Sequence, residues 1–178
     1  MTTPRHAARL DDGSLTGQWT LDPARSTVHL ATRSMWGLAP VKGTFGELSG
    51  HGTLTPDGEA TGTVTIKAAS LDTKIKKRDE HLRSADFFDS ANHPDIVFTA
   101  QRITRAGAGS VTVYGSLQVH GSAQPLSFTA AVSAAGDEVG FDAEVEIDRS
   151  DFGLTWNRLG MASMKNTITV HAIFTRHP

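Results

Sequence analysis

The sequence of 178 residues contains no cysteine. A disulfide framework, a thiolate metal site and a cysteine nucleophile are therefore all excluded. The fold must rest on packing and hydrogen bonds alone, and a chain of this length can bury a continuous core. No fixed-period repeat, low-complexity tract or proline-rich linker divides the chain, so we expect a single domain.

The chain also lacks an excess of charge of one sign and any long apolar run. Its 17 basic and 19 acidic residues leave a formal net charge of -2. No global field attracts a polyanion, and we expect no nucleic-acid partner. No segment approaches the roughly 20 apolar residues needed to span a bilayer, which predicts no stable membrane insertion.

The first residues carry no hydrophobic segment of the kind found in secretory signals. Arg5 and Arg9 are present, but the longest apolar stretch between them is Ala7-Ala8. We therefore expect a cytoplasmic protein, with residues 1–16 as a disordered leader and residues 17–178 as the folded domain.

From residue 18 onward, short runs of β-favouring residues alternate apolar and polar side chains. In residues 139–147 the apolar positions alternate with acidic ones, and the same period of two recurs in residues 111–119, 126–132 and 168–174. Turn residues such as those at 56–58 separate the runs. About eight antiparallel strands with one helix favour a closed barrel whose interior can hold one small ligand. Periodicity alone leaves an open sheet and a sandwich as alternatives.

A helical pattern interrupts the strands near the middle of the chain. Leu71, Ile75 and Leu82 recur at spacings of four and seven, which predicts one apolar helix face. Asp79 and Arg83 are four residues apart, so we expect a surface ion pair on this helix.

Eight histidines are present, yet none lies in an HExxH or HxH arrangement. We therefore expect no dedicated metal site and no cofactor. His29, His120 and His171 fall on the polar faces of their strands, which is typical of solvent-facing or hydrogen-bonded histidine. His81 is a conceivable acid–base group in the helix, but a structural hydrogen bond is the favoured interpretation.

Large apolar residues beside glycine lie outside the regular strand pattern in two loops. Trp36 and Leu38 belong to one loop, and Trp156 and Met161 to the other. Such residues suit the mouth of a pocket, with ordinary core packing at the barrel ends as an equal alternative. Phe87 carries the same ambiguity, because the aromatic residue that follows it cannot face the same side.

Six separate motifs resemble the YceI family of lipocalin-like barrels. Residues 78–89 (RDEHLRSADFFD) closely match the helix signature of that family, and residues 148–154 (DRSDFGL) match its RSDFGL motif. The others are residues 19–22, 41–46, 93–98 and 115–121. All six occur in the order of the family, and the resemblance covers nearly the whole folded part.

The resemblance implies an all-β fold, namely an eight-stranded antiparallel lipocalin-like barrel with one short helix inserted between strands. It also implies a polyisoprenoid or another long-chain amphiphile in the lumen. We therefore predict non-enzymatic binding, carriage or storage of such a lipid, with no catalytic residue. Because members of the family often pair, a homodimer is a further expectation.

The expected ligand-binding residues are the inward apolar side chains of the strands together with the large residues of the loops. They are Val28, Leu30, Trp36, Leu38, Phe45, Phe87, Phe98, Val113, Leu117, Phe128, Phe141, Val145, Trp156, Met161, Ile168 and Val170.

Two other functions stay open. A small-barrel enzyme, of the isomerase or cyclase type, would need a polar group directed at a hydrophobic substrate. The alternation leaves only loop residues such as Asn157, Arg158 or His81 for that role. A filled-barrel stress-associated protein without a ligand would instead show dense side-chain packing in the lumen.

Overall fold

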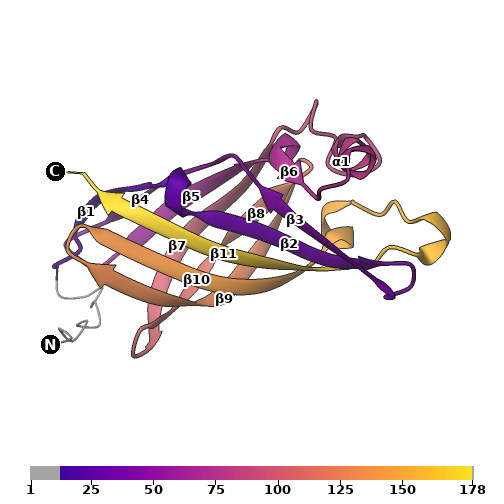
Figure 1. Cartoon of the computed structure of the whole chain (residues 1–178). Helices are drawn as coiled ribbons and strands as arrows, with labels where there is room; N and C mark the ends of the chain where they lie inside the picture. The colour runs from indigo at the N-terminus through magenta and orange to yellow at the C-terminus, as the bar shows by residue number, and fades with distance from the viewer. Residues whose placement is uncertain (1–12, 178) are drawn as a thin grey trace, which may run out of the picture.

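The computed structural model describes residues 13–177 and is built mainly from β-strands (Figure 1). The α-helix in that part of the chain is α1 (Lys76–Arg83). The strands are β1 (Gly17–Leu21), β2 (Thr27–Ser34), β3 (Ala39–Phe45), β4 (Leu48–Leu54), β5 (Ala60–Lys67), β6 (Leu71–Asp72), β7 (Asp95–Gly107), β8 (Ser110–Val119), β9 (Ser122–Ala135), β10 (Glu138–Asp148) and β11 (Lys165–Arg176). Within residues 13–177, no helix is both long enough and apolar enough to cross a membrane.

Eight strands close into a barrel. In order around the wall these are β1, β4, β5, β7, β8, β9, β10 and β11, and β11 pairs back with β1. Neighbouring strands are antiparallel, and the closing pairs include Trp19 with Arg176 and Leu21 with Phe174. Closure removes the unpaired edges that an open sheet would leave. The predicted eight-stranded antiparallel barrel with one inserted helix is confirmed, and the open sheet and the sandwich are excluded.

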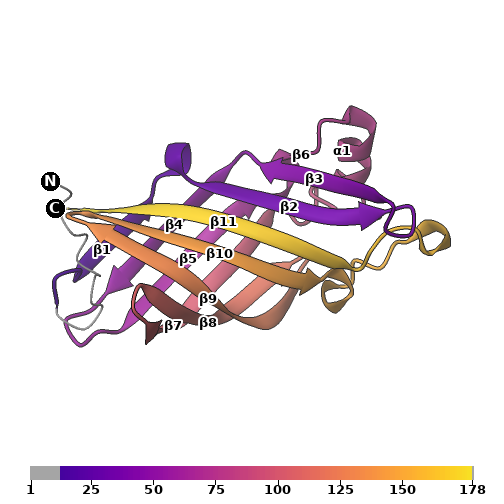
Figure 2. The ribbon, with the colours of Figure 1, turned by 60° about the horizontal axis from the view of Figure 1, so that its bottom comes forward.

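Three of the long strands are broken partway along. A short 3-10 turn, Pro23–Arg25, separates β1 from β2, Gly46 and Glu47 separate β3 from β4, and the turn Ala68–Ser70 separates β5 from β6. Beyond these breaks the sheet continues, because β11 also pairs with β2, β2 with β3, and β3 with β6. Figures 1 and 2 show α1 and the chain between β10 and β11 together at this end of the barrel. We refer to it as the mouth end.

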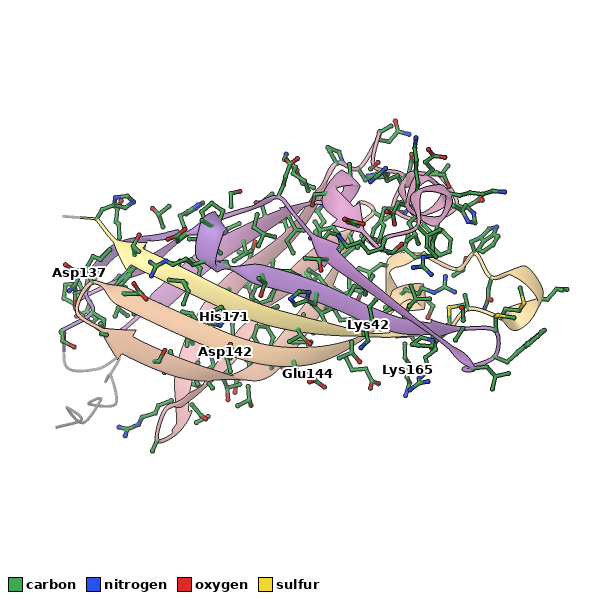
Figure 3. All side chains as sticks on the ribbon, viewed as in Figure 1. Lys42, Asp137, Asp142, Glu144, Lys165 and His171 are labelled. Carbon is green, nitrogen blue, oxygen red and sulfur yellow. The ribbon has the colours of Figure 1, made fainter. Side chains whose placement is uncertain are left out.

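The alternation of the sequence places apolar side chains on the inner face of the wall. On β10, Val139 and Val145 are buried, whereas Asp142 and Glu144 are exposed. Figure 3 labels Asp142, Glu144 and His171 on the outer face of the β10–β11 wall, where His171 Nδ1 lies 2.6 Å from Asp142 Oδ1. Because successive side chains of a strand point to opposite faces, the inner wall is apolar and the outer wall polar.

Gly115 on β8 occupies an inward position that has no room for a side chain. A Cβ atom at this residue would lie 2.8 Å from Cζ of Phe98 on β7. The ring of Phe98 can therefore lie over β8, and its centre is 5.4 Å from that of Phe128 on β9. The absence of a side chain at Gly115 thus leaves room for the Phe98 ring inside the barrel.

The helix is shorter than the sequence predicts. It begins at Lys76, so Leu71 is buried in β6 and Ile75, directly before the helix, is 52% exposed. Asp79 provides the physical reason, because its Oδ1 atom accepts hydrogen bonds from the backbone N–H (3.0 Å) and the hydroxyl (2.5 Å) of Thr73. These bonds hold the chain before α1 in a turn instead of a further helical turn.

The predicted ion pair between Asp79 and Arg83 is wrong. Asp79 is buried against Thr73. Arg83 instead donates from Nε to the carbonyl oxygen of Ala69 (3.0 Å) and from Nη2 to that of Leu71 (3.3 Å). Both side chains therefore attach α1 to the segment that precedes it, and neither attaches to the other.

Replacing Asp79 by alanine should lower the free energy of unfolding by about 1–3 kcal/mol, because two buried donors of Thr73 would lose their acceptor. Urea unfolding followed by circular dichroism measures the change. Glu80→Ala, at the exposed next residue, is the matched control and should stay within about 0.5 kcal/mol of the wild type. Equal losses in the two variants would contradict the anchoring role of Asp79.

Leu15 packs in the folded part of the protein, although the sequence predicts a disordered leader up to residue 16. Its side chain is 6% exposed and lies in a cluster with Leu54 and Val139. Its carbonyl oxygen accepts a hydrogen bond from Trp19 Nε1 at 3.0 Å. The packed chain therefore includes residue 15, and residues 1–12 of the predicted leader lie outside the described residues.

Candidate functional site: an apolar lumen

A cavity of ≈480 Å³ occupies the lumen of the barrel. This volume lies in the range of about 300–1,000 Å³ that is usual for small-molecule pockets. The predicted ligand-binding residues that line it are Val28, Leu30, Phe45, Phe87, Phe98, Val113, Leu117, Phe128, Phe141, Val145, Trp156, Ile168 and Val170. The lumen is thus a largely apolar space with room for a ligand.

Strand pairing explains how lining residues far apart in the sequence come together. Val145 on β10 stands opposite Ile168 on β11, and Val170 on β11 stands opposite Val28 on β2. Residues directly opposite each other on neighbouring strands point to the same face of the sheet. Each pair therefore contributes two side chains to the same part of the cavity wall.

Trp36, Leu38 and Met161 do not line the cavity. Trp36 is 65% exposed and Leu38 is 84% exposed on the hairpin between β2 and β3, so core packing is the wrong interpretation for both. Met161 is half-buried, and its carbonyl oxygen accepts a hydrogen bond from the backbone N–H of Trp36 at 3.1 Å. The tip of this hairpin extends past the closed part of the barrel (Figure 1), whereas Leu30 and Val41, farther from the tip, line the cavity.

The cavity also has lining residues that the sequence analysis does not place there. Ile66, Leu126 and Phe174 belong to alternating strands, so the period of two contained the signal for them. Phe152 and Leu154 line the cavity from the segment between β10 and β11. No strand pattern exists in that segment, and their inward orientation follows only from the way it folds over the mouth end.

Arg149, in the turn directly after β10, holds that segment in place. Its guanidinium donates hydrogen bonds to the carbonyl oxygens of Leu154 (2.7 Å), Trp156 (2.8 Å) and Ser163 (3.0 Å). The residue is 7% exposed. Burial lowers the pKa of the guanidinium, and the negative charge of Asp148 partly opposes this effect. Arg149 is therefore a buried cation that cross-links the backbone of the segment covering the mouth end.

Aromatic rings surround Arg149 where the cavity reaches the mouth end. Arg149 Cζ lies 5.5 Å from the centre of the Phe87 ring, and that ring lies 5.2 Å from the Trp156 ring. The His81 ring packs edge-on against Trp156 at 4.5 Å, and its Nε2 lies 2.9 Å from Asp86 Oδ2. Phe87, His81, Trp156 and Arg149 all border the cavity. They give it one end that is both aromatic and polar.

The lumen is suited to apolar burial more than to acid–base chemistry. Among residues 13–177, no aspartate or glutamate borders the cavity. Both polar atoms of the Asn157 amide are bonded to the backbone of Ala162, each at 2.8 Å. Of the loop residues considered for an enzyme, His81 borders the cavity, whereas the side chain of Arg158 lies outside what the structure describes.

Comparisons with known proteins give a consistent result. Residues 19–175 match the model of a protein family described as a YceI-like domain. Protein YceI of Escherichia coli is 34% identical over 131 residues, which cover 69% of this chain and 68% of that protein. The crystal structure of BcnA from Burkholderia cenocepacia has a TM-score of 0.78 and 25% identity, and the match covers 86% of this chain and 98% of BcnA.

A second solved structure has the same fold at lower identity. It is a polyisoprenoid binding domain from Saccharophagus degradans, with a TM-score of 0.73 and 17% identity. The match covers 89% of this chain and 98% of that domain. At this identity the likeness shows a shared fold alone.

Proposed function

The chain belongs to the YceI family, and from that premise we propose that its barrel binds a polyisoprenoid or a similar long-chain amphiphile as a non-enzymatic carrier or store. The apolar lumen of ≈480 Å³ is the observation that carries the proposal. The Saccharophagus degradans domain, which has the same fold and is described as polyisoprenoid-binding, supports it.

Burial of the lipid chain supplies enough free energy for such binding. About 20 carbons at ~0.8 kcal/mol per CH₂ give a gross gain of roughly 16 kcal/mol. Association and ordering oppose this gain by an estimated 4–15 kcal/mol or more. At the lower cost roughly 12 kcal/mol of the gain remains, which allows the proposed binding without a charged anchor.

The two alternative functions have weaker support. The His81–Asp86 pair is the feature that favours an isomerase or cyclase, because His81 borders the cavity. Its carboxylate partner Asp86 is half-exposed and does not border the lumen, so this pair does not face a buried substrate. A filled barrel would leave little internal space, whereas this lumen has a cavity of ≈480 Å³.

Native mass spectrometry of protein purified without detergent tests the proposal directly. Organic extraction and mass analysis of the released compounds then identify the ligand. We expect a stoichiometric long-chain lipid, or uptake of a prenylated quinone or fatty amide by the stripped protein. A bare protein that takes up neither would contradict the proposal.

A larger side chain inside the lumen should reduce lipid uptake. Ala143 on β10 lines the cavity, so Ala143→Phe should reduce uptake at least about tenfold while leaving the barrel folded, because the new ring occupies space that the lipid needs. Uptake is measured by native mass spectrometry. Ala131→Phe, on the neighbouring strand β9, adds the same ring at an exposed position and should leave uptake unchanged. Equal uptake in both variants would place the ligand elsewhere.

The cytoplasmic location and the homodimer remain predictions from the sequence and the family. Cell fractionation tests the location. Light scattering on the purified protein tests the dimer, and a monomer mass across the micromolar range would contradict it.

A further inference from the structure

Three side chains outside the lumen converge at the base of β7 and at the tip of the β8–β9 hairpin. They are Asp89, His93 and His120, and their ligand atoms all lie within 4.8 Å of one another. All three residues are half-buried, and none borders the cavity. We propose that they form a binding site for a divalent transition-metal ion of the zinc class, with three protein ligands and an open coordination position.

The segment before β7 presents two of the ligands on a single turn. The backbone N–H of His93 donates to the carbonyl oxygen of Asp89 at 2.8 Å, which places the two side chains one turn apart. Asn92 donates from Nδ2 to both carboxylate oxygens of Asp89, at 3.1 and 3.0 Å. A hydrogen-bonded outer partner of this kind orients a ligating carboxylate and leaves further lone pairs free for an ion.

His120 reaches the site from the tight turn that joins two strands of the barrel wall. It lies with Gly121 in the two-residue turn between β8 and β9, not on a strand face as the sequence predicts. Both residues have positive φ, 54° for His120 and 74° for Gly121, as in a type I′ turn. Asn-Gly or Gly-Gly is the preferred pair there, and histidine is among the non-glycine residues that adopt positive φ. The turn thus presents an imidazole at its tip, beside the His93 ring.

Gly121 allows the two imidazoles to meet. A Cβ atom at this residue would lie 3.0 Å from Cε1 of His93, so a side chain there would crowd the His93 ring. The His93 and His120 rings have centres 4.6 Å apart. No hydrogen bond from either ring is found within residues 13–177. The ring nitrogens are therefore free to turn toward a shared ion.

The donor set and the distances select the class of ion. Two imidazoles and one carboxylate are typical ligands of zinc and of other late divalent metals, whereas magnesium and calcium prefer oxygen ligands alone. Atoms at about 2.0–2.2 Å from one tetrahedral zinc ion lie roughly 3.3–3.6 Å apart. Small rotations of the two imidazole side chains, toward an Asp89 carboxylate that Asn92 holds in place, would close the present separations of up to 4.8 Å.

An ion at this site would connect two parts of the mouth end that are distant in sequence. Asp89 directly follows Phe87 and Phe88, which line the cavity, and His120 belongs to the β8–β9 turn. The ion would thus tie the segment carrying these two rings to the barrel wall. The site itself does not depend on the proposed lipid ligand.

Calorimetric titration of tag-free, chelator-stripped protein with Zn²⁺ tests the site, with Co²⁺ absorption reporting the ligand geometry. We expect one Zn²⁺ per chain, a higher melting temperature with zinc, and no binding of Mg²⁺ at the same concentration. Zinc binding should weaken at least about 10-fold to 100-fold in each of the variants Asp89→Asn, His93→Ala and His120→Asn. Removal of an outer-shell partner already causes a loss of that size, and these three residues are the proposed direct ligands.

Two variants separate the loss of a ligand from general damage. His120→Asn removes an imidazole but supplies the residue that a type I′ turn prefers, so the metal-free variant should melt no lower than the wild type. His171→Ala is the matched control, because it removes an imidazole that also lies beside a carboxylate, on the outer wall (Figure 3). Its zinc affinity should not change.

Three results would overturn the proposal. They are an absence of saturable zinc binding, wild-type affinity in both His93→Ala and His120→Asn, and an equal loss in His171→Ala. The lipid experiments are independent, because a chain that takes up lipid but not zinc fails only here.

Discussion

Phe128→Asp should abolish lipid uptake while the barrel remains folded. Phe128 points into the lumen from β9 beside Phe98, and the cavity reaches it. In the unoccupied barrel, water can hydrate the new carboxylate. A lipid chain would have to displace that water and leave an unpaired charge against hydrocarbon, which costs several kcal/mol. We therefore expect affinity to fall at least about 100-fold, which corresponds to roughly 2.8 kcal/mol.

Uptake of a prenylated quinone by the stripped protein, followed by native mass spectrometry, measures this loss. Thr129→Asp introduces the same charge at the exposed next residue of β9 and should bind as the wild type does. Phe141→Asp, at a second lumen position, should repeat the effect if Phe128→Asp proves too unstable. A folded Phe128→Asp variant with unchanged uptake would count against the lumen as the binding site.

Arg149→Leu should lower the free energy of unfolding by about 2–4 kcal/mol. The variant leaves the carbonyl oxygens of Leu154, Trp156 and Ser163 without their common donor. Hydrogen bonds to a charged group contribute about 1.5–3 kcal/mol each. Removing the buried cation also recovers its desolvation cost, which is why the net loss is smaller than the sum of the bonds. For a chain of this length, the melting temperature should fall by roughly 4–16 °C.

Thermal unfolding of Arg149→Lys separates the charge of Arg149 from its shape. Lysine keeps the positive charge but presents one ammonium group instead of a planar fork, so it cannot reach all three carbonyl oxygens. We expect Arg149→Lys to lose much of the stability that Arg149→Leu loses, and Arg105→Leu, at an exposed position on β7, to lose little. Wild-type stability in Arg149→Lys would show that charge alone is what matters.

The inner wall of the barrel could be predicted because it depends on a local property of the chain. Val145, Ile168 and Val170 face the lumen because successive side chains of a strand point to opposite faces, whatever the strand pairs with. A shift of the strand register by one residue would turn every apolar side chain of the strand to the outer face, so the pattern of apolar and polar residues is strongly constrained. The motifs at residues 78–89 and 148–154 indicated the family and its fold.

The mouth end was predicted less well because its contacts are not periodic. Trp36 and Leu38 resemble pocket residues in the sequence, yet they lie on a hairpin beyond the closed part of the wall. Asp79 has the spacing of a surface ion pair, but it is buried against Thr73 and holds the chain before α1 in a turn, so the helix begins only at Lys76. Arg149 belongs to the motif at residues 148–154, but the motif does not reveal its role, since its partners are backbone carbonyl oxygens that any residue could supply.

By itself, the sequence determined the all-β class, the strand residues that face the lumen and the resemblance to a barrel family, because strand periodicity and motif order are carried by neighbouring residues. Only the tertiary structure decided where the wall closes, which loops cover the mouth end and that Asp89, His93 and His120 meet. Those features depend on pairing between segments far apart in the chain, and no local pattern encodes the distance between them.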